Sequence, residues 1–326
     1  MAGSERSDRL EVILSLPDHP LLHYITPLPQ EEIQSTLEQL YSAFYIGFSQ
    51  KERLKLAQEV YNWLIQPAEV DLAANNIQTL VFVLDGFLRN IPMASLYDGQ
   101  QYLIEKYSIG LSQGLQLFPE GLESARLNVL MLGLTEARQG FTPLPGVGVE
   151  IEEIAKKIDS KTILLNEEFT QVAFQKKVEG KPFRVVHLAT HGQFSSDPEE
   201  TFLLTWDTRL QVKEFSELLQ EQNRDPIELL ILSACQTAAG DNRAGLGLAG
   251  LALRSGARST LATLWSVDDL STAEFMIDFY QVLTTKSETN LTKAEALRQA
   301  QIALIKNPQY NHPYFWAPFV LVGNWL

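Results

Sequence analysis

The sequence has a single cysteine and fewer basic than acidic side chains. Cys235 stands alone among 326 residues, so no disulfide can form within the chain, and a lone cysteine is typical of proteins from a reducing compartment. Lys and Arg number 26 against 40 Asp and Glu, which gives 26 − 40 = −14. Nucleic-acid binding requires clustered basic residues that neutralise phosphates, so this balance argues against a nucleic-acid partner.

Long apolar runs are also missing. No apolar stretch approaches the ~20 residues that span a bilayer, and the first twenty residues contain no apolar run of signal-peptide length. We therefore expect a soluble, cytoplasmic protein that does not bind membranes. With 45% hydrophobic and 20% charged residues, the composition is that of a globular chain, long enough to bury a core without disulfides or metals.

Strand and helix patterns alternate over residues 126–326 and predict an α/β domain. Strands are predicted at RLNVLMLGL, KTILLN, FRVVHLAT, IELLILSA, STLATLW and APFVLVG, with helical patterns between them. Near-continuous apolar strands that alternate with helices are typical of a mostly parallel sheet with helices on both faces. Two helices within 31–66 and the strand LVFVLDG predict a second lobe at residues 31–125. Residues 1–30, polar and rich in proline, are interpreted as a lead-in or linker.

Two chemically reactive residues follow predicted strands. His191 comes after VVHLAT and Cys235 after ELLILSA, and ligands of parallel sheets bind at the carboxyl ends of the strands. One predicted helix lies between them, so the two strands can be neighbours in the sheet. An imidazole beside a thiol raises the fraction of reactive thiolate and can protonate a leaving amine. The amides of Gly192 and Cys235 begin loops, where they could stabilise an oxyanion.

These residues also have interpretations without catalysis. A free cysteine often packs as a small hydrophobic residue, and a histidine at a strand end is often structural. His187 lies four residues before His191, on the same face of the strand, and a metal site could be assembled from His187, His191 and Cys235. Zinc sites, however, use three or four well-placed ligands, and the chain has no second cysteine. We interpret His187 as a core histidine and expect no metal.

Four dispersed motifs provide a more specific signal: VVHLATHG, LLILSACQTAAG, GLGLAGLALRSGARSTLATLWSVDD and HPYFWAPFVLVGNW. Together they resemble the CHAT domain, a caspase-like domain often attached to tetratricopeptide repeats, and the similarity covers roughly residues 31–326. The resemblance implies the fold of caspases, separases and gingipains, with residues 31–125 as a degenerate caspase-like lobe and 126–326 as the catalytic domain. It also implies a cysteine endopeptidase with His191 as general base and Cys235 as nucleophile.

The resemblance also bears on the substrate. Separases and gingipains bind a basic residue before the scissile bond through an acidic group, which by analogy would be Asp268 or Asp269 in WSVDD, pairing with Arg or Lys. The alternative is that one of these aspartates caps the helix that follows. Caspases instead bind a substrate aspartate through arginine. Because Arg243, Arg254 and Arg258 are available for such a contact, an acidic substrate residue stays an open alternative.

Two other functions stay open. The first is a non-catalytic caspase-like scaffold that binds and regulates a partner protein. The second is a nucleotide switch, suggested by GVG before a predicted helix, but Ile151 replaces the last glycine of G-x-G-x-x-G and no G-x-x-x-x-G-K-[ST] motif exists. We interpret GVG as a strand-to-helix turn and expect no cofactor. The expected partners are a protein substrate and a regulatory protein with tetratricopeptide repeats, and the resemblance implies a bacterial, particularly cyanobacterial, source.

Overall fold

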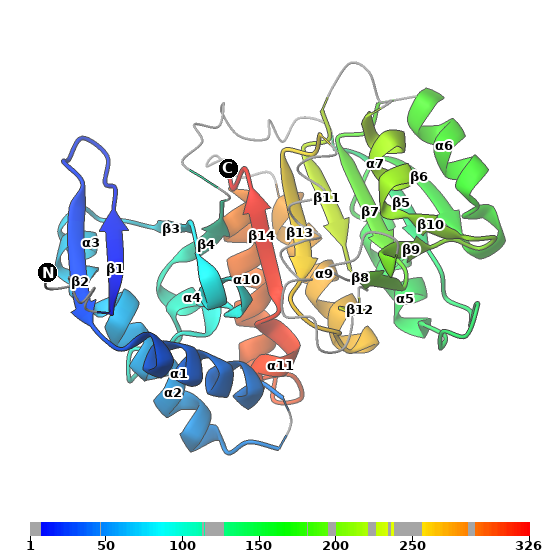
Figure 1. The fold of residues 1–326 in the computed structure, drawn as a ribbon. Helices are drawn as coiled ribbons and strands as arrows, with labels where there is room; N and C mark the ends of the chain where they lie inside the picture. Colours follow the sequence, from blue (N-terminus) through cyan, green and yellow to red (C-terminus); the bar gives the residue numbers. More distant parts are fainter. Residues whose placement is uncertain are drawn as a thin grey trace, which may run out of the picture. The chain divides into compact units, whose positions relative to one another are not determined.

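The computed structural model describes residues 8–45, 47–112, 114, 127–180, 182–194, 200–220, 226–233, 236–237, 256–285 and 291–326. The chain divides into two compact units (Figure 1). The smaller comprises Met1–Leu80 and Asp85–Tyr107, and the larger Val81–Leu84 and Ser108–Leu326. The domain boundary expected at residue 125 stays a prediction. Val81–Leu84 and Ser108–Leu111 belong to the larger unit because they carry strands of its main sheet.

The smaller unit is mostly helical. It contains β1 (Arg9–Leu14), β2 (Leu22–Pro27), α1 (Gln30–Ala43), α2 (Gln50–Leu64), α3 (Glu69–Ala74) and α4 (Leu103–Lys106), with short 3-10 helices η1 (Gln66–Ala68), η2 (Gly86–Asn90) and η3 (Met93–Ser95). Buried leucines of α1 and the buried Val60 and Tyr61 of α2 form its core. Lys106 pairs with Glu69 at 3.1 Å and with Asp98 at 3.2 Å.

A hairpin occupies most of the segment that the sequence suggests is a lead-in. β1 and β2 pair antiparallel from Arg9 opposite Pro27 to Leu14 opposite Leu22. Exposed and half-buried residues alternate along both strands, which is the period of a strand with one covered face. Pro17 and Pro20 lie in the connection and Pro27 ends β2, where a two-stranded sheet tolerates them, while Pro29 is the N-cap of α1.

The larger unit is built on an eight-stranded sheet with the order β3-β4-β14-β13-β11-β7-β5-β6. The strands are β3 (Thr79–Phe82), β4 (Ser108–Leu111), β5 (Asn128–Gly133), β6 (Ser160–Leu165), β7 (Val185–Ala189), β11 (Leu229–Leu232), β13 (Ser259–Thr263) and β14 (Phe319–Gly323). β13 and β14 are antiparallel, whereas β4–β14, β11–β13, β7–β11, β5–β7 and β5–β6 are parallel. The predicted mostly parallel sheet is confirmed.

Helices cover both faces of this sheet, as predicted. They are α5 (Pro145–Ala155), α6 (Gln171–Gly180), α7 (Val212–Gln220), α9 (Asp269–Leu283), α10 (Lys293–Lys306), α11 (Pro313–Trp316) and the 3-10 helix η4 (Asn166–Glu168). On one face, Phe174 of α6 and Phe215 of α7 pack on the buried leucines of β5, β7 and β11. On the other face lie α5 and α9, which contact His187 of β7 through Glu150 and Tyr280. No helix within the described ranges is long and apolar enough to cross a membrane.

A second, smaller sheet has the order β10-β9-β8-β12. Its strands are β8 (Gly192–Phe194), β9 (Phe202–Leu204), β10 (Arg209–Gln211) and β12 (Gln236–Thr237). β8–β9 and β9–β10 are antiparallel, and β8–β12 is parallel. β8 begins three residues after β7, and β12 four residues after β11, so this sheet continues from two adjacent strands of the large one. Strands of two or three residues show no readable alternation, which is why the sequence did not predict them.

Lys293, the first residue of α10, is an unusual member of the larger unit's interior. Its side chain is 1% exposed, and no group in the described part of the chain hydrogen-bonds its Nζ. Burial lowers the pKa of Lys293 to about 8. The charge of Glu228 opposes this decrease, and the charges of Arg258 and Arg184 add to it. The positive end of the helix dipole also disfavours an ammonium at this position.

Replacing Lys293 tests how much the burial of its charge lowers the free energy of unfolding. Because the pKa falls from 10.5 to about 8 on folding, the unfolded chain binds more protons between these values, and stability rises with pH across that window. Below pH 8 the penalty is complete. Lys293→Met should therefore raise the free energy of unfolding at pH 7 on the order of 3 kcal/mol. In urea titrations this advantage should shrink toward pH 10.5. A pH-independent difference, or the same gain from the exposed Lys306→Met, would contradict the assignment.

Candidate active site

The strands that precede His191 and Cys235 in the sequence are adjacent in the large sheet. β7 and β11 run parallel, with Leu188 opposite Leu232, and the amide of Ser233 donates to the carbonyl of Leu188 at 3.0 Å. The sequence-based expectation that these two strands are neighbours is therefore confirmed. Parallel strands end at the same edge of a sheet, where α/β proteins bind their ligands.

The segments that follow the two residues are paired as well. Gln193 of β8 lies opposite Gln236 of β12, in a parallel ladder. His191 precedes β8 directly, and Cys235 precedes β12 directly in the sequence. Cys235 itself lies outside the described residues. Gly192 is buried at the start of β8, opposite Leu203 of β9, and its role in an oxyanion hole stays a prediction, as does that of the Cys235 amide.

The imidazole of His191 is held by a backbone carbonyl and an aromatic ring. Its Nε2 lies 2.7 Å from the carbonyl oxygen of Thr142, and because a carbonyl only accepts, Nε2 carries the hydrogen. The ring of Phe141 packs against the imidazole at 4.9 Å between centroids. The neutral ring therefore presents Nδ1 as its proton acceptor. Sequence reasoning missed Thr142 because a backbone carbonyl leaves no residue-type signal.

Asp268 caps the helix that follows it. The residue is exposed, and its Oδ1 accepts a 2.9 Å hydrogen bond from the amide of Ser271 at the start of α9. The capping interpretation is thus confirmed for this residue. Capping engages one carboxylate oxygen and places the charge at the favourable end of the helix dipole.

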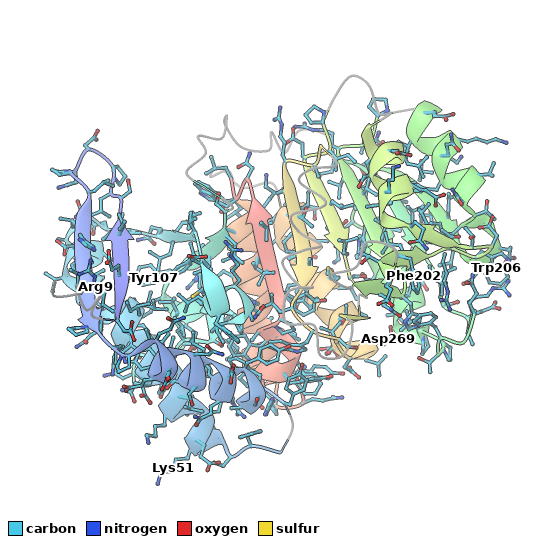
Figure 2. The ribbon with its side chains drawn as sticks, in the orientation of Figure 1. Arg9, Lys51, Tyr107, Phe202, Trp206 and Asp269 are labelled. Carbon is cyan, nitrogen blue, oxygen red and sulfur yellow. The ribbon has the colours of Figure 1, made fainter. Side chains whose placement is uncertain are left out.

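Asp269 is instead bonded to the neighbouring helix. Its Oδ2 accepts from the amide of Gly146, at the start of α5, at 2.6 Å. The pKa of Asp269 is raised, chiefly by burial. The Gly146 hydrogen bond opposes this rise, Glu150 and Asp268 add to it, and a protonated His191 would oppose it. This carboxylate is half-buried and lies within electrostatic range of His191. Figure 2 shows it at the start of α9.

His187 is a core residue, as predicted. It is 1% exposed; its Nδ1 lies 3.2 Å from the hydroxyl of Tyr280, and its Nε2 lies 2.7 Å from Oε1 of Glu150 in a poorly aligned geometry. The Tyr280 ring stacks on the imidazole with an interplanar angle of 4°. Burial, together with the charge of Glu150, raises the pKa of Tyr280 well above its usual value. Within the described ranges, no three His, Cys, Asp or Glu side chains are placed to hold a metal ion.

Arg258 is far from the strand ends that carry His191. It precedes β13, at the amino-terminal edge of the parallel strands, and its Nη1 pairs with Glu228 at 2.9 Å. It therefore cannot provide the acidic-substrate site that the sequence left open. Arg243 and Arg254 lie outside the described residues.

Two glycines of α5 give a matched test of the link between α5 and Asp269. A Cβ at Gly146 would lie 2.7 Å from the carbonyl oxygen of Asp269 and 2.8 Å from its Oδ2, whereas one at Gly148 would meet only Thr135 Cγ2 at 3.6 Å. Gly146→Ala should lower the free energy of unfolding by about 1–3 kcal/mol because the backbone of α9 must move. Gly148→Ala should be neutral or stabilising by up to about 1 kcal/mol. Equal urea midpoints for the two variants would show that the close approach does not exist.

Most of the chain is similar to a known protein family. A model of the CHAT domain family matches residues 54–324. No curated protein sequence matches the chain.

Three solved structures resemble its fold. Gingipain R, described as an Arg specific cysteine proteinase, has a TM-score of 0.52 and 8% identity over 91% of this chain and 75% of that chain. Separase from Saccharomyces cerevisiae, solved with securin, has a TM-score of 0.51 and 12% identity over 95% of this chain and 21% of that chain. A complex of the pro- and mature domains of Porphyromonas gingivalis RgpB has a TM-score of 0.48 and 8% identity, covering 91% and 77%.

Proposed function

The chain belongs to the CHAT domain family and has the fold of caspase-like cysteine peptidases, and on this premise we propose that it is a cysteine endopeptidase with a His191–Cys235 dyad. The observation that carries the proposal is the double pairing around these residues. β7 pairs with β11 before them and β8 with β12 after them. A base and a thiol are useful to each other only at close range, and adjacent strand ends favour such an approach.

The contact between His191 and Thr142 defines the proton path. With Nε2–H donated to the Thr142 carbonyl, Nδ1 accepts the proton of the Cys235 thiol. The sulfur attacks the scissile carbonyl carbon, and the amides of Gly192 and Cys235 stabilise the resulting oxyanion. The carbon–nitrogen bond then breaks as Nδ1 returns the proton to the leaving amine. Water, deprotonated by the same nitrogen, hydrolyses the thioester and restores the thiol.

The proposed substrate has Arg or Lys before the scissile bond. Asp269 is the better placed of the two aspartates, because its half-buried carboxylate lies within the electrostatic range of His191 and is oriented by Gly146. Asp268 adds a second negative charge beside it while capping α9. A guanidinium that approaches Asp269 would form a charge-assisted hydrogen bond in a partly desolvated place.

A regulatory protein is part of the proposal as well. The separase whose fold the chain resembles was solved together with a second protein, securin. For this chain, a regulator with tetratricopeptide repeats stays a prediction from sequence. So do the cytoplasmic location and the bacterial source.

Removing either member of the dyad should abolish turnover. Cys235→Ala and His191→Ala should each reduce cleavage of a mixed peptide library on the order of 10³-fold or more, because nucleophile and base act as one unit. Thermal unfolding should be unchanged within a few degrees. Residual cleavage by a clean Cys235→Ala preparation would exclude this nucleophile. If no variant cleaves and a thiol-directed acyloxymethyl-ketone probe does not label Cys235 in the wild type, the scaffold function is favoured.

The two aspartates can be separated by isosteric substitution. Asp269→Asn keeps an oxygen for the Gly146 amide but loses the charge, so kcat/KM for peptides with Arg at the cleavage site should fall about 10–100-fold. Peptides with Gln at that position should change little. Asp268→Asn should have a small effect, because asparagine is an equally good N-cap. A uniform loss on both peptides would show that Asp269 only supports the fold.

A further inference from the structure

A tight turn lies directly before the carbonyl that holds His191. The amide of Phe141 donates to the carbonyl of Arg138 at 2.7 Å, and the amide of Arg138 to Phe141 at 3.3 Å. Both central residues have positive φ, +47° at Gln139 and +90° at Gly140, which matches the type of turn that closes two-residue hairpins. This turn fixes the direction in which Phe141 and Arg138 leave the backbone.

A second turn joins β9 and β10. The amide of Thr205 donates to the carbonyl of Thr208 at 2.9 Å, and Thr205 Oγ1 accepts from the amide of Thr208 at 3.1 Å. Trp206 lies within this turn, and Arg209 follows it as the first residue of β10. Phe202 begins β9 on the other side of the turn.

Each turn is accompanied by an arginine whose guanidinium lies over an aromatic ring. The guanidinium carbon of Arg138 is 3.2 Å from the centroid of Trp206. That of Arg209 is 4.7 Å from the centroid of Phe202 and 6.0 Å from that of Phe141. Figure 2 labels Phe202 and Trp206 in this part of the larger unit. Stacking on rings restricts the guanidinium planes while their edges stay able to donate hydrogen bonds.

The arginine pair is connected to the candidate catalytic residue through Phe141. That ring contacts Phe202 edge-on at 6.2 Å and the His191 imidazole at 4.9 Å. The next residue, Thr142, accepts the His191 hydrogen bond. The guanidinium of Arg209 is therefore one side chain away from the imidazole, and Arg138 is linked to Phe141 through the backbone hydrogen bonds of the turn.

Neither arginine is neutralised by a carboxylate within the part of the chain that the structure describes. Other arginines do form such pairs: Arg9, Arg89, Arg184, Arg258 and Arg298 each lie within 4.0 Å of an Asp or Glu. Arg209 is exposed, and the Nε of Arg138 is buried without a hydrogen-bond partner among the described groups. In a chain of net charge −14, two such cations on the turns that adjoin Phe141 indicate a site for an external anion.

We propose that Arg138 and Arg209 form a cationic subsite that binds an acidic side chain of the polypeptide substrate near the scissile bond. The subsite would help to select the peptides that the proposed peptidase cleaves. In that role it rests on the proposed function. Restricted guanidiniums lose little entropy when they pair with a carboxylate, so a single Asp or Glu is a sufficient ligand. Together with the proposed acidic contact at Asp269, the subsite would fix the register of a peptide that carries charges of both signs.

Peptide binding to the full chain carrying Cys235→Ala tests this without turnover. The probes are fluorescein-labelled peptide pools with one Arg in an Ala/Gly/Ser background and either Glu or Gln at the third position on both sides. Fluorescence anisotropy should show about tenfold tighter binding of the Glu pool at 50 mM salt, declining as salt rises. Combined Arg138→Gln and Arg209→Gln substitutions should bring the ratio to about one. Arg298→Gln, at an arginine already paired with Glu295, should leave it unchanged.

A charge reversal distinguishes recognition from a purely structural role. Arg209→Glu should weaken the Glu pool and favour a third pool with Lys in place of Glu, an effect that loss of a packing contact cannot produce. If the double variant unfolds, the single variants Arg209→Glu and Arg209→Lys still test whether Arg209 recognises the acidic residue. Arg209→Lys should keep part of the preference for the Glu pool. Equal binding of the Glu and Gln pools by the parent would overturn the subsite. So would equal losses for both pools in the arginine variants.

The same pools separate this inference from the peptidase proposal. Arginine-dependent preference for the Glu pool without cleavage by the unmodified chain would support the subsite and contradict the peptidase. Cysteine-dependent cleavage with no preference for the Glu pool would support the peptidase and overturn the subsite.

Discussion

The parallel pairing of β7 with β11 is the constraint on which the candidate site depends. The two strands end at one edge of the sheet, and the chain pairs again immediately beyond, as β8 with β12. The segments around His191 and Cys235 are therefore tied together before and after these residues. β8 in turn carries β9, and β9 carries β10, so the turn with Trp206 and Arg209 takes its position from the same pairing. Segments far apart in the sequence become neighbours through backbone hydrogen bonds.

The second organising contact joins two helices through a charge. The amide at the start of α5 donates to Asp269 at the start of α9, so one carboxylate meets the positive ends of two helix dipoles. Behind it, Glu150 of α5 and Tyr280 of α9 enclose His187. The face of the sheet that bears α5 and α9 thus holds its charged groups in fixed positions. The face that bears α6 and α7 is packed almost wholly with apolar side chains.

Sequence reasoning predicted the elements whose hydrophobic pattern extends over many residues. The apolar strands, the flanking helices and the adjacency of β7 and β11 follow from periodicity and from the helix between them. Features made by single long-range contacts did not follow. GVG was expected as a strand-to-helix turn, but these residues form the first turn of α5, which begins at Pro145. The anionic partner of Gly146, Asp269, lies 123 residues away in the sequence. The Thr142 carbonyl carries no residue-type signature, and the ring contacts of Arg138 and Arg209 require two turns whose proximity depends on the small sheet. Composition also misled, since prolines in the β1–β2 connection, at the end of β2 and at the N-cap of α1 resembled those of a linker.

The position of β14 has a consequence for the order in which the molecule is assembled. This strand lies between β4 and β13, yet it is synthesised after every other strand in the described part of the chain. During synthesis on a ribosome, β3 and β4 therefore cannot pair with the rest of the sheet until residues 319–323 emerge. Long-range closure of this kind is slow and leaves strand edges exposed in the meantime. A nascent chain therefore lacks a complete sheet until β14 is inserted between β4 and β13.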